Sequence, residues 1–362
     1  MIYYYDKKYR FVELFEDTTG VLIRSNVLKN EIETNQLPIM RSFPELIDIG
    51  IMGACEAGRT GICVSANVDC YQCGASSTEP DMSLQEYKHI ISQCKGRVFQ
   101  VALGGAGDPN KHNQFEEILR ITRENGIIPN YTTSGYQLSN SEIYLTKKYC
   151  GAVAVSFYSK LDERGNESNP HTISAIKRYV EAGCVTNIHY VISKKNIKEA
   201  LFRVKHNLFP EGINAVVFLL YKPVGYASRK WVLDRNNRDY IELLQTVSEI
   251  KSDWRYGFDT CQSPAIFEYS RNVARESIEL CEAARFSMYI DSHSIAYPCS
   301  FGREKKEHSV NLQSCTLEDA WASEQFTRFR DQQSQQCLKC MADVCRGCAL
   351  DLTPGLCNGG EK

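Results

Sequence analysis

Sixteen cysteines dominate the chemistry available to this 362-residue chain, and most of them lie in two groups. Four lie between Cys55 and Cys73, and nine lie between Cys261 and Cys357. A chain of this length can bury a core without disulfides, and its first residues contain no apolar segment like that of a signal peptide. We therefore expect a cytoplasmic protein with reduced thiols, and we interpret the grouped cysteines as metal ligands.

The first group lies in a glycine-rich segment, Gly53–Gly74, that contains Cys55, Cys63, Cys70 and Cys73. Cys70 and Cys73 form a Cys-x-x-Cys pair, which can bring two thiolates to one metal or cluster, and a further ligand from the same loop would close the site. A structural zinc site and a thioredoxin-like redox pair are the alternatives. The redox pair is disfavoured because the loop continues for about ten residues before the next predicted helix.

The second group is a dense run near the end of the chain, in a region rich in Cys, Ser and Gln and poor in apolar runs. A segment of this composition cannot form a hydrophobic core alone, but bound metal can fold it. The run suits a zinc knuckle as well as an iron–sulfur site. It consists of Cys337, Cys340, Cys345, Cys348 and Cys357.

The rest of the chain alternates short apolar runs with amphipathic segments, a pattern typical of βα units and a parallel sheet. It predicts an α/β fold: a partial (βα)6 TIM-like barrel with a Cys-rich, metal-stapled C-terminal extension. Such folds place their chemistry at the carboxyl ends of the strands. The predicted strands are Leu46–Met52, Val98–Leu103, Ile127–Thr132, Ala152–Phe157, Val185–Ser193 and Ala215–Tyr221. The predicted helices are Ser83–Cys94, Gln114–Asn125, Ser141–Cys150, Thr172–Ala182, Asn196–Asn207 and Arg238–Ser252.

Three parts follow from this pattern: an N-terminal extension over residues 1–45 with a β-hairpin at Arg10–Arg24, the barrel over 46–258 and the Cys-rich domain over 259–362. The formal net charge of −2 gives no sign of the excess positive charge that nucleic-acid binding requires, and no apolar stretch is long enough for a membrane helix. The tail over residues 331–362 holds three basic and four acidic residues, which disfavours nucleic-acid binding through zinc knuckles. We therefore expect neither nucleic acid nor membrane as a partner.

A cysteine loop after the first strand of a partial βα barrel resembles that of the radical S-adenosylmethionine (SAM) enzymes. In that family three cysteines bind three irons of a 4Fe–4S cluster, and the fourth iron binds SAM. The usual spacing is three residues and then two; here Cys70 and Cys73 keep the second gap, with the aromatic Tyr71 inside it. The resemblance implies a first ligand at Cys55, directly after the strand, with Cys63 as the alternative.

Other strand ends fit the same resemblance. The segment Leu103–Pro109 is similar to the family's Gly-Gly-Glu-Pro motif, whose backbone meets the SAM amino group, although Asp108 stands where relatives have Glu. An ordinary strand-to-helix turn is the alternative. The residues that the resemblance assigns to SAM are Tyr71, Gly104, Gly105, Gly107, Asp108, Ser134, Ser156 and Gly225.

The tail is similar to the SPASM extension of radical SAM enzymes, in which a Cys, a Pro-Cys and a Leu-Glu-x-x-Trp helix precede a cysteine run. Here Ser294 replaces a usual glycine, and the gaps in the run are one residue shorter. The resemblance implies two auxiliary 4Fe–4S clusters. One would use Cys281, Cys299 and Cys348, with Cys261 as a candidate fourth ligand, and the other Cys337, Cys340, Cys345 and Cys357. Cys315 and the barrel cysteines Cys94, Cys150 and Cys184 are interpreted as small core residues.

The resemblance implies an enzyme that cleaves SAM to a 5′-deoxyadenosyl radical, which abstracts hydrogen from a peptide or protein during its maturation. A reductase, flavodoxin or ferredoxin would supply the electron. Asp259 is a candidate base for the substrate radical, with a structural role as the alternative. The competing interpretations are a SPASM enzyme acting on a small molecule and a non-catalytic metal-binding scaffold.

Overall fold

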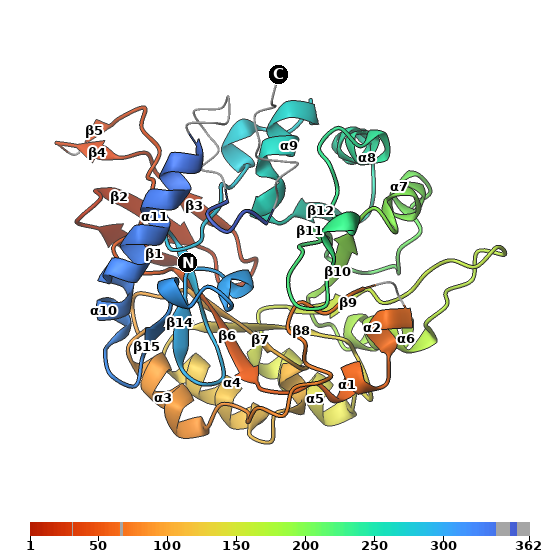
Figure 1. Cartoon of the computed structure of the whole chain (residues 1–362), viewed down its shortest axis with the longest axis horizontal. Helices are drawn as coiled ribbons and strands as arrows, with labels where there is room; N and C mark the ends of the chain where they lie inside the picture. Colours follow the sequence, from red (N-terminus) through yellow and green to blue (C-terminus); the bar gives the residue numbers. More distant parts are fainter. Residues whose placement is uncertain (31, 66–67, 338–347, 353–362) are drawn as a thin grey trace.

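A ten-stranded sheet forms the centre of the protein in the computed structural model, which describes residues 1–30, 32–65, 68–337 and 348–352 (Figure 1). Its strand order is β12-β11-β10-β9-β8-β7-β6-β13-β14-β15, and neighbours from β6 to β12 run parallel. Each crossover between parallel strands carries a helix outside the sheet, as βα units require. The predicted α/β class with a TIM-like partial barrel is confirmed.

The six predicted strands are β6 (Leu46–Met52), β7 (Gln100–Gly105), β8 (Ile128–Thr133), β9 (Val153–Ser156), β10 (Thr186–Ile192) and β11 (Ala215–Leu220). The six helices are α3 (Leu84–Ser92), α4 (Phe115–Glu124), α5 (Asn140–Tyr149), α6 (Pro170–Glu181), α7 (Ile197–Lys205) and α8 (Arg238–Glu249). Local capping fixes several helix starts: Ser83 and Glu86 form a capping box at the start of α3, and Ser139 and Glu142 form one at the start of α5.

The sheet extends beyond the six predicted strands at both sides. β12 (Arg255–Phe258) adds a seventh parallel strand next to β11. β13 (Ser287–Ile290), from the Cys-rich tail, pairs parallel with β6, so that Tyr289 stands opposite Asp48. The tail therefore continues the barrel sheet through β6.

The rest of the tail packs around β13. β14 (Ile295–Tyr297) and β15 (Val310–Asn311) complete an antiparallel edge, and α9 (Ser263–Tyr269), α10 (Leu317–Ala322) and α11 (Glu324–Cys337) accompany it. The predicted Leu-Glu-x-x-Trp helix is α10, and a Thr316–Asp319 capping box starts it. No helix among the described residues has the length and apolarity needed to cross a membrane.

The N-terminal extension forms a three-stranded antiparallel sheet of β1 (Ile2–Asp6), β2 (Phe11–Phe15) and β3 (Leu22–Arg24), followed by the small hairpin of β4 (Leu28–Lys29) and β5 (Ile32–Glu33). β2 and β3 are the predicted hairpin, and β1 adds the third strand.

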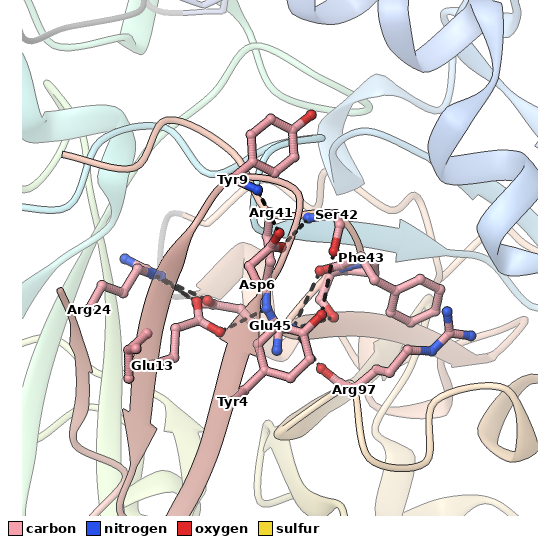
Figure 2. Close-up of polar contacts among 12 residues, drawn as sticks. Tyr4, Asp6, Tyr9, Glu13, Arg24, Arg41, Ser42, Phe43, Glu45 and Arg97 are labelled. Atoms are coloured by element: carbon pink, nitrogen blue, oxygen red, sulfur yellow. Dashed lines mark hydrogen bonds and ion pairs between the residues drawn. The ribbon is translucent and has the colours of Figure 1, made fainter. Parts of the chain in front are cut away.

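A buried arginine fastens the N-terminal sheet to the barrel and the tail (Figure 2). Arg41 is fully buried, its Nε lies 2.8 Å from Glu13 Oε2 and its guanidinium stacks 3.7 Å from the centre of the Tyr4 ring. The same guanidinium donates to the main-chain carbonyls of Phe43, Pro44 and Arg97. The indole of Trp321 in α10 donates to the Arg41 carbonyl at 3.0 Å, so one residue contacts all three parts of the chain.

Candidate active site at the strand ends

A cavity of about 420 Å³ opens at the carboxyl ends of the parallel strands, where the sequence predicted the chemistry to lie. The cysteine loop covers it from one side, the ends of β7 to β11 form its walls, and tail residues Tyr289, Ser300 and Phe301 close another side. Of the residues assigned to SAM from the sequence, those that border the cavity are Tyr71, Gly104, Gly105, Gly107, Asp108, Ser134 and Ser156.

Three of the four loop cysteines border the cavity: Cys55, Cys63 and Cys70. Cys55 caps the short helix α1 (Glu56–Arg59), and its Sγ accepts the N–H of Gly58 at 3.1 Å. Cys63 lies in α2 (Ile62–Ser65). Cys73 does not border the cavity and has a φ of +54°. The structure therefore brings both candidates for the first ligand to the cavity, together with Cys70.

The thiols of Cys55 and Cys63 are poor acids as long as they bind no metal. Burial raises the pKa of Cys55 to about 11 and that of Cys63 to about 12. A metal must therefore displace protons when it binds, which couples its affinity to pH. Among the described residues, no three His, Cys, Asp or Glu side chains converge as ligands of a single ion.

Residues that follow strands β10 and β11 hold the second half of the cysteine loop in place. Asp69 accepts hydrogen bonds from Lys195 Nζ at 2.7 Å and from the Tyr221 hydroxyl. The N–H of Tyr226 donates to the Cys70 carbonyl at 3.1 Å. A Cβ added to Gly225, whose φ is +64°, would lie 2.6 Å from the Tyr71 carbonyl oxygen. Gly225 therefore lies against the loop backbone rather than on the cavity wall.

The glycine turn after β7 packs closely against the start of the cysteine loop. A Cβ on Gly107 would lie 2.2 Å from the Ala54 carbonyl oxygen, and Gly105 has a φ of +118°. A Cβ on Gly104, in contrast, would meet no atom within 4 Å, so this residue presents bare backbone to the cavity. These packing constraints fit a site where a ligand approaches main-chain atoms.

Asp108 links the ends of β7 and β8. Its carboxylate accepts the Ser134 N–H at 2.7 Å and the Ser134 hydroxyl at 2.5 Å. Burial raises the pKa of Asp108, and the two bonds from Ser134 oppose that shift. The aspartate that replaces the usual glutamate thus orders a neighbouring turn, and both predicted residues contact each other at the cavity.

The far wall carries a buried ion pair between Lys222 and Asp259. Lys222 Nζ bonds to Asp259 Oδ2 and donates to the Leu220 carbonyl at 3.1 Å. Gln262 Nε2 donates to the other oxygen of Asp259 at 3.0 Å. Asp259, the predicted base, therefore borders the cavity with both carboxylate oxygens bonded. This arrangement is equally compatible with the structural role that was the alternative for this residue.

Four tail cysteines gather behind this wall. Burial raises the pKa of Cys261, Cys281 and Cys299, and the charges of neighbouring cysteines, including Cys348, add to the shift for Cys281 and Cys299. These are the four residues predicted for one auxiliary cluster. Of the other set, Cys340, Cys345 and Cys357 lie outside the described residues, as does the side chain of Cys337. Cys94, Cys150, Cys184 and Cys315 lie apart from both groups, and Cys94 is fully buried.

Sequence reasoning missed several side chains of the cavity, among them Asp48, His189, Lys222 and Tyr289. Burial lowers the pKa of His189 to about 4, so the ring is neutral, and its Nδ1 lies 3.3 Å from the Thr132 hydroxyl oxygen. His189 could have been found from the alternation along strand β10, in which every second side chain faces the inside of the barrel. Lys222 is the second residue after β11 and could have been found by the strand-end rule.

Comparison with known proteins agrees with this geometry. Residues 281–349 match the SPASM family model, described as an iron–sulfur cluster-binding domain. The chain is 23% identical over 316 residues to the mycofactocin maturase MftC of Mycolicibacterium smegmatis, covering 78% of this chain and 75% of MftC.

Three solved structures of two proteins share the fold. SuiB of Streptococcus suis bound to S-adenosylmethionine gives a TM-score of 0.62 at 19% identity, over 83% of this chain and 72% of SuiB. SuiB bound to its precursor peptide SuiA gives 0.60 at 18% identity, over 79% and 66%. The protein anSMEcpe with bound AdoMet and a peptide gives 0.56 at 16% identity, over 82% and 86%. The chain therefore combines a segment similar to the SPASM iron–sulfur cluster-binding domain with the barrel fold of SuiB and anSMEcpe, both solved with bound S-adenosylmethionine.

Proposed function

We propose that this protein is a radical SAM enzyme that modifies a peptide or protein substrate. The observation that carries the proposal is the convergence of the cysteine loop, the exposed backbone of Gly104 and the Asp108–Ser134 pair on one cavity at the strand ends. The SPASM match and the fold shared with SAM-bound proteins support it.

The chain's residues fit a 4Fe–4S cluster and SAM at this cavity. Cys70, with partners among Cys55, Cys63 and Cys73, would hold the cluster, and the backbone at Gly104 and Gly105 would face the SAM amino group. When bound, the cluster and SAM supply a 5′-deoxyadenosyl radical able to take a hydrogen atom from an unreactive C–H bond. The protein orients the substrate and excludes water, and Lys222 keeps the Asp259 carboxylate bonded beside the substrate space.

A peptide is the substrate class that the relatives support. SuiB was solved with a precursor peptide and anSMEcpe with a short peptide, and MftC is called a maturase. The tail cysteines would hold auxiliary clusters next to the cavity. An external reductase, flavodoxin or ferredoxin as electron donor remains a prediction, as does the absence of nucleic acid and membrane partners.

The test is SAM cleavage by protein reconstituted with iron and sulfide without oxygen. With dithionite and SAM, we expect 5′-deoxyadenosine and methionine in equal amounts, measured by liquid chromatography and mass spectrometry. Protein stripped of iron should form neither product. A fully reconstituted protein that binds iron but forms no 5′-deoxyadenosine would contradict the proposal and favour the metal-binding scaffold.

Gly225→Ala is expected to lower the rate of SAM cleavage at least about 10-fold. The new Cβ would clash with the carbonyls of Tyr71 and Cys70. Because these are main-chain atoms, the clash can be relieved only if the backbone of the cysteine loop moves. Gly126→Ala is the matched control, because its φ of +75° gives similar strain and its Cβ meets no atom within 4 Å. We expect this control to lose only about 1–2 kcal/mol of stability and to cleave SAM normally. Equal rates for the two variants would show that Gly225 does not support the loop.

A further inference from the structure

One carboxylate in the cavity has no partner in the described part of the chain. Four aspartates border the cavity: Asp48, Asp69, Asp108 and Asp259. Asp69 is bonded to Lys195 and Tyr221, Asp108 to Ser134, and Asp259 to Lys222 and Gln262. Among the described residues, Asp48 makes neither a hydrogen bond nor an ion pair, which is unusual because buried charges are normally paired.

The strand register explains why the carboxyl of Asp48 faces the cavity. Its neighbours Ile47 and Ile49 are fully buried in the hydrophobic core, so Asp48 points to the other face of β6. In the sheet, Asp48 lies between Ala102 of β7 and Tyr289 of β13. The small side chain of Ala102 leaves room beside the carboxyl. Asp48 therefore lies where the barrel meets the SPASM domain.

No positive charge of the cavity is available to neutralise Asp48. Lys222 is the single lysine or arginine among the described residues that border the cavity, and Asp259 already holds it. The only histidine of that lining, His189, is neutral, since burial lowers its pKa to about 4. Burial also raises the pKa of Asp48 to about 7, which reflects the cost of a carboxylate charge without a partner.

Resting on the proposed function, we propose that Asp48 binds a protonated nitrogen of the peptide substrate, either a lysine ammonium or a free amino terminus. A cation is the group that gains most from this carboxylate, because an ion pair in a partly desolvated cavity is stronger than one in water. The ligand would lie beside the apolar rings of Tyr289 and Phe301, which border the same cavity and can contact the aliphatic part of such a residue. Asp48 would then decide which residue of a substrate enters the barrel.

The proposal can be tested with three synthetic peptides and the reconstituted holoenzyme at low ionic strength. The first, acetyl-Gly-Ala-Lys-Ala-Gly-amide, carries its only charge on lysine. The second replaces lysine by norleucine and is neutral, and the third is the norleucine peptide with a free amino terminus. Ligand-observed NMR gives their dissociation constants. We expect the wild type to bind at least one charged peptide about 10-fold more tightly than the neutral one. The charged peptide that binds more tightly shows whether the nitrogen comes from lysine or from the amino terminus.

Asp48→Asn keeps the shape of the side chain and removes its charge, so it should abolish this preference while the iron content stays that of the wild type. Asp253→Asn, which neutralises an exposed aspartate, is the matched control and should keep the preference. Three results would overturn the proposal: a preference that survives in Asp48→Asn, equal or absent binding of the three peptides by the wild type, or loss of iron in Asp48→Asn, which would assign the residue to a cluster. SAM cleavage is measured on the same wild-type sample. Cleavage without a charge preference refutes the role of Asp48 alone, whereas absent cleavage refutes the proposed function.

Discussion

Cys70→Ala is expected to abolish the formation of 5′-deoxyadenosine from SAM and to remove the iron of the barrel cluster. Cys70 belongs to every candidate ligand set of the loop, and it borders the cavity. Its carbonyl is fixed by Tyr226, and the preceding Asp69 is fixed by Lys195 and Tyr221, so no neighbouring thiol can easily take its place. Loss of one of three thiolates should leave the cluster too labile to hold SAM.

The measurement compares iron per chain and 5′-deoxyadenosine per hour for the two proteins after identical reconstitution. Cys94→Ala is the matched control, because Cys94 is fully buried. It lies in the turn after helix α3, and its thiol donates to the carbonyl of Ile90 in that helix. This control should keep the activity and lose about 1 kcal/mol of stability from the small cavity. A Cys70→Ala protein with wild-type activity would show that the cluster is held by other residues.

Arg41→Ala is expected to lower the free energy of unfolding by about 3–5 kcal/mol. The substitution removes the donors to three main-chain carbonyls and leaves Glu13 without the cation nearest to it. It also removes the guanidinium that fills the space between the rings of Tyr4 and Phe99. Burial and the neighbouring Glu45 already raise the pKa of Glu13 to about 9, and without Arg41, which lowers it, this carboxyl would hold its proton more tightly still.

Urea unfolding followed by tryptophan fluorescence measures the effect, because the Trp321 indole bonds directly to the Arg41 carbonyl. Arg328→Ala is the control: its exposed pair with Glu324 spans one turn of α11 and should contribute less than about 0.5 kcal/mol. Equal unfolding midpoints for Arg41→Ala and the wild type would mean that the N-terminal sheet does not depend on this residue.

Much of the barrel could be predicted because its strands are continuous apolar runs and its helices carry clear caps. β12 escaped prediction because Arg-Tyr-Gly-Phe is short and includes a glycine, which is unfavourable in strands. The pairing of β13 with β6 could not be found either, since no local pattern reports which distant strand lies at a sheet edge. The division of the chain after residues 45 and 258 remains a prediction.

The candidate site was predictable where it follows the strand-end rule and unpredictable where it depends on side-chain direction. Gly104, Ser134 and Ser156 could be placed because each lies at or near the end of a predicted strand. The sequence could not rank Cys55 against Cys63 as the first ligand, since spacing along a loop does not fix which thiols face inward. Asp48 was missed because one acidic residue within an apolar strand looks like a polar position on a solvated face.

The parallel pairing of β13 with β6 also sets the order in which this protein can be completed during synthesis. β6 ends at Met52 and β13 begins at Ser287, so 234 residues must be added between the two strands. At about 5–20 residues per second, the ribosome needs roughly 10–50 s to supply that partner. Throughout this interval one edge of the first barrel strand has no permanent neighbour. The nascent chain is therefore a candidate client for chaperones that cover exposed strand edges, and the first strand of the barrel is the last to be fully paired.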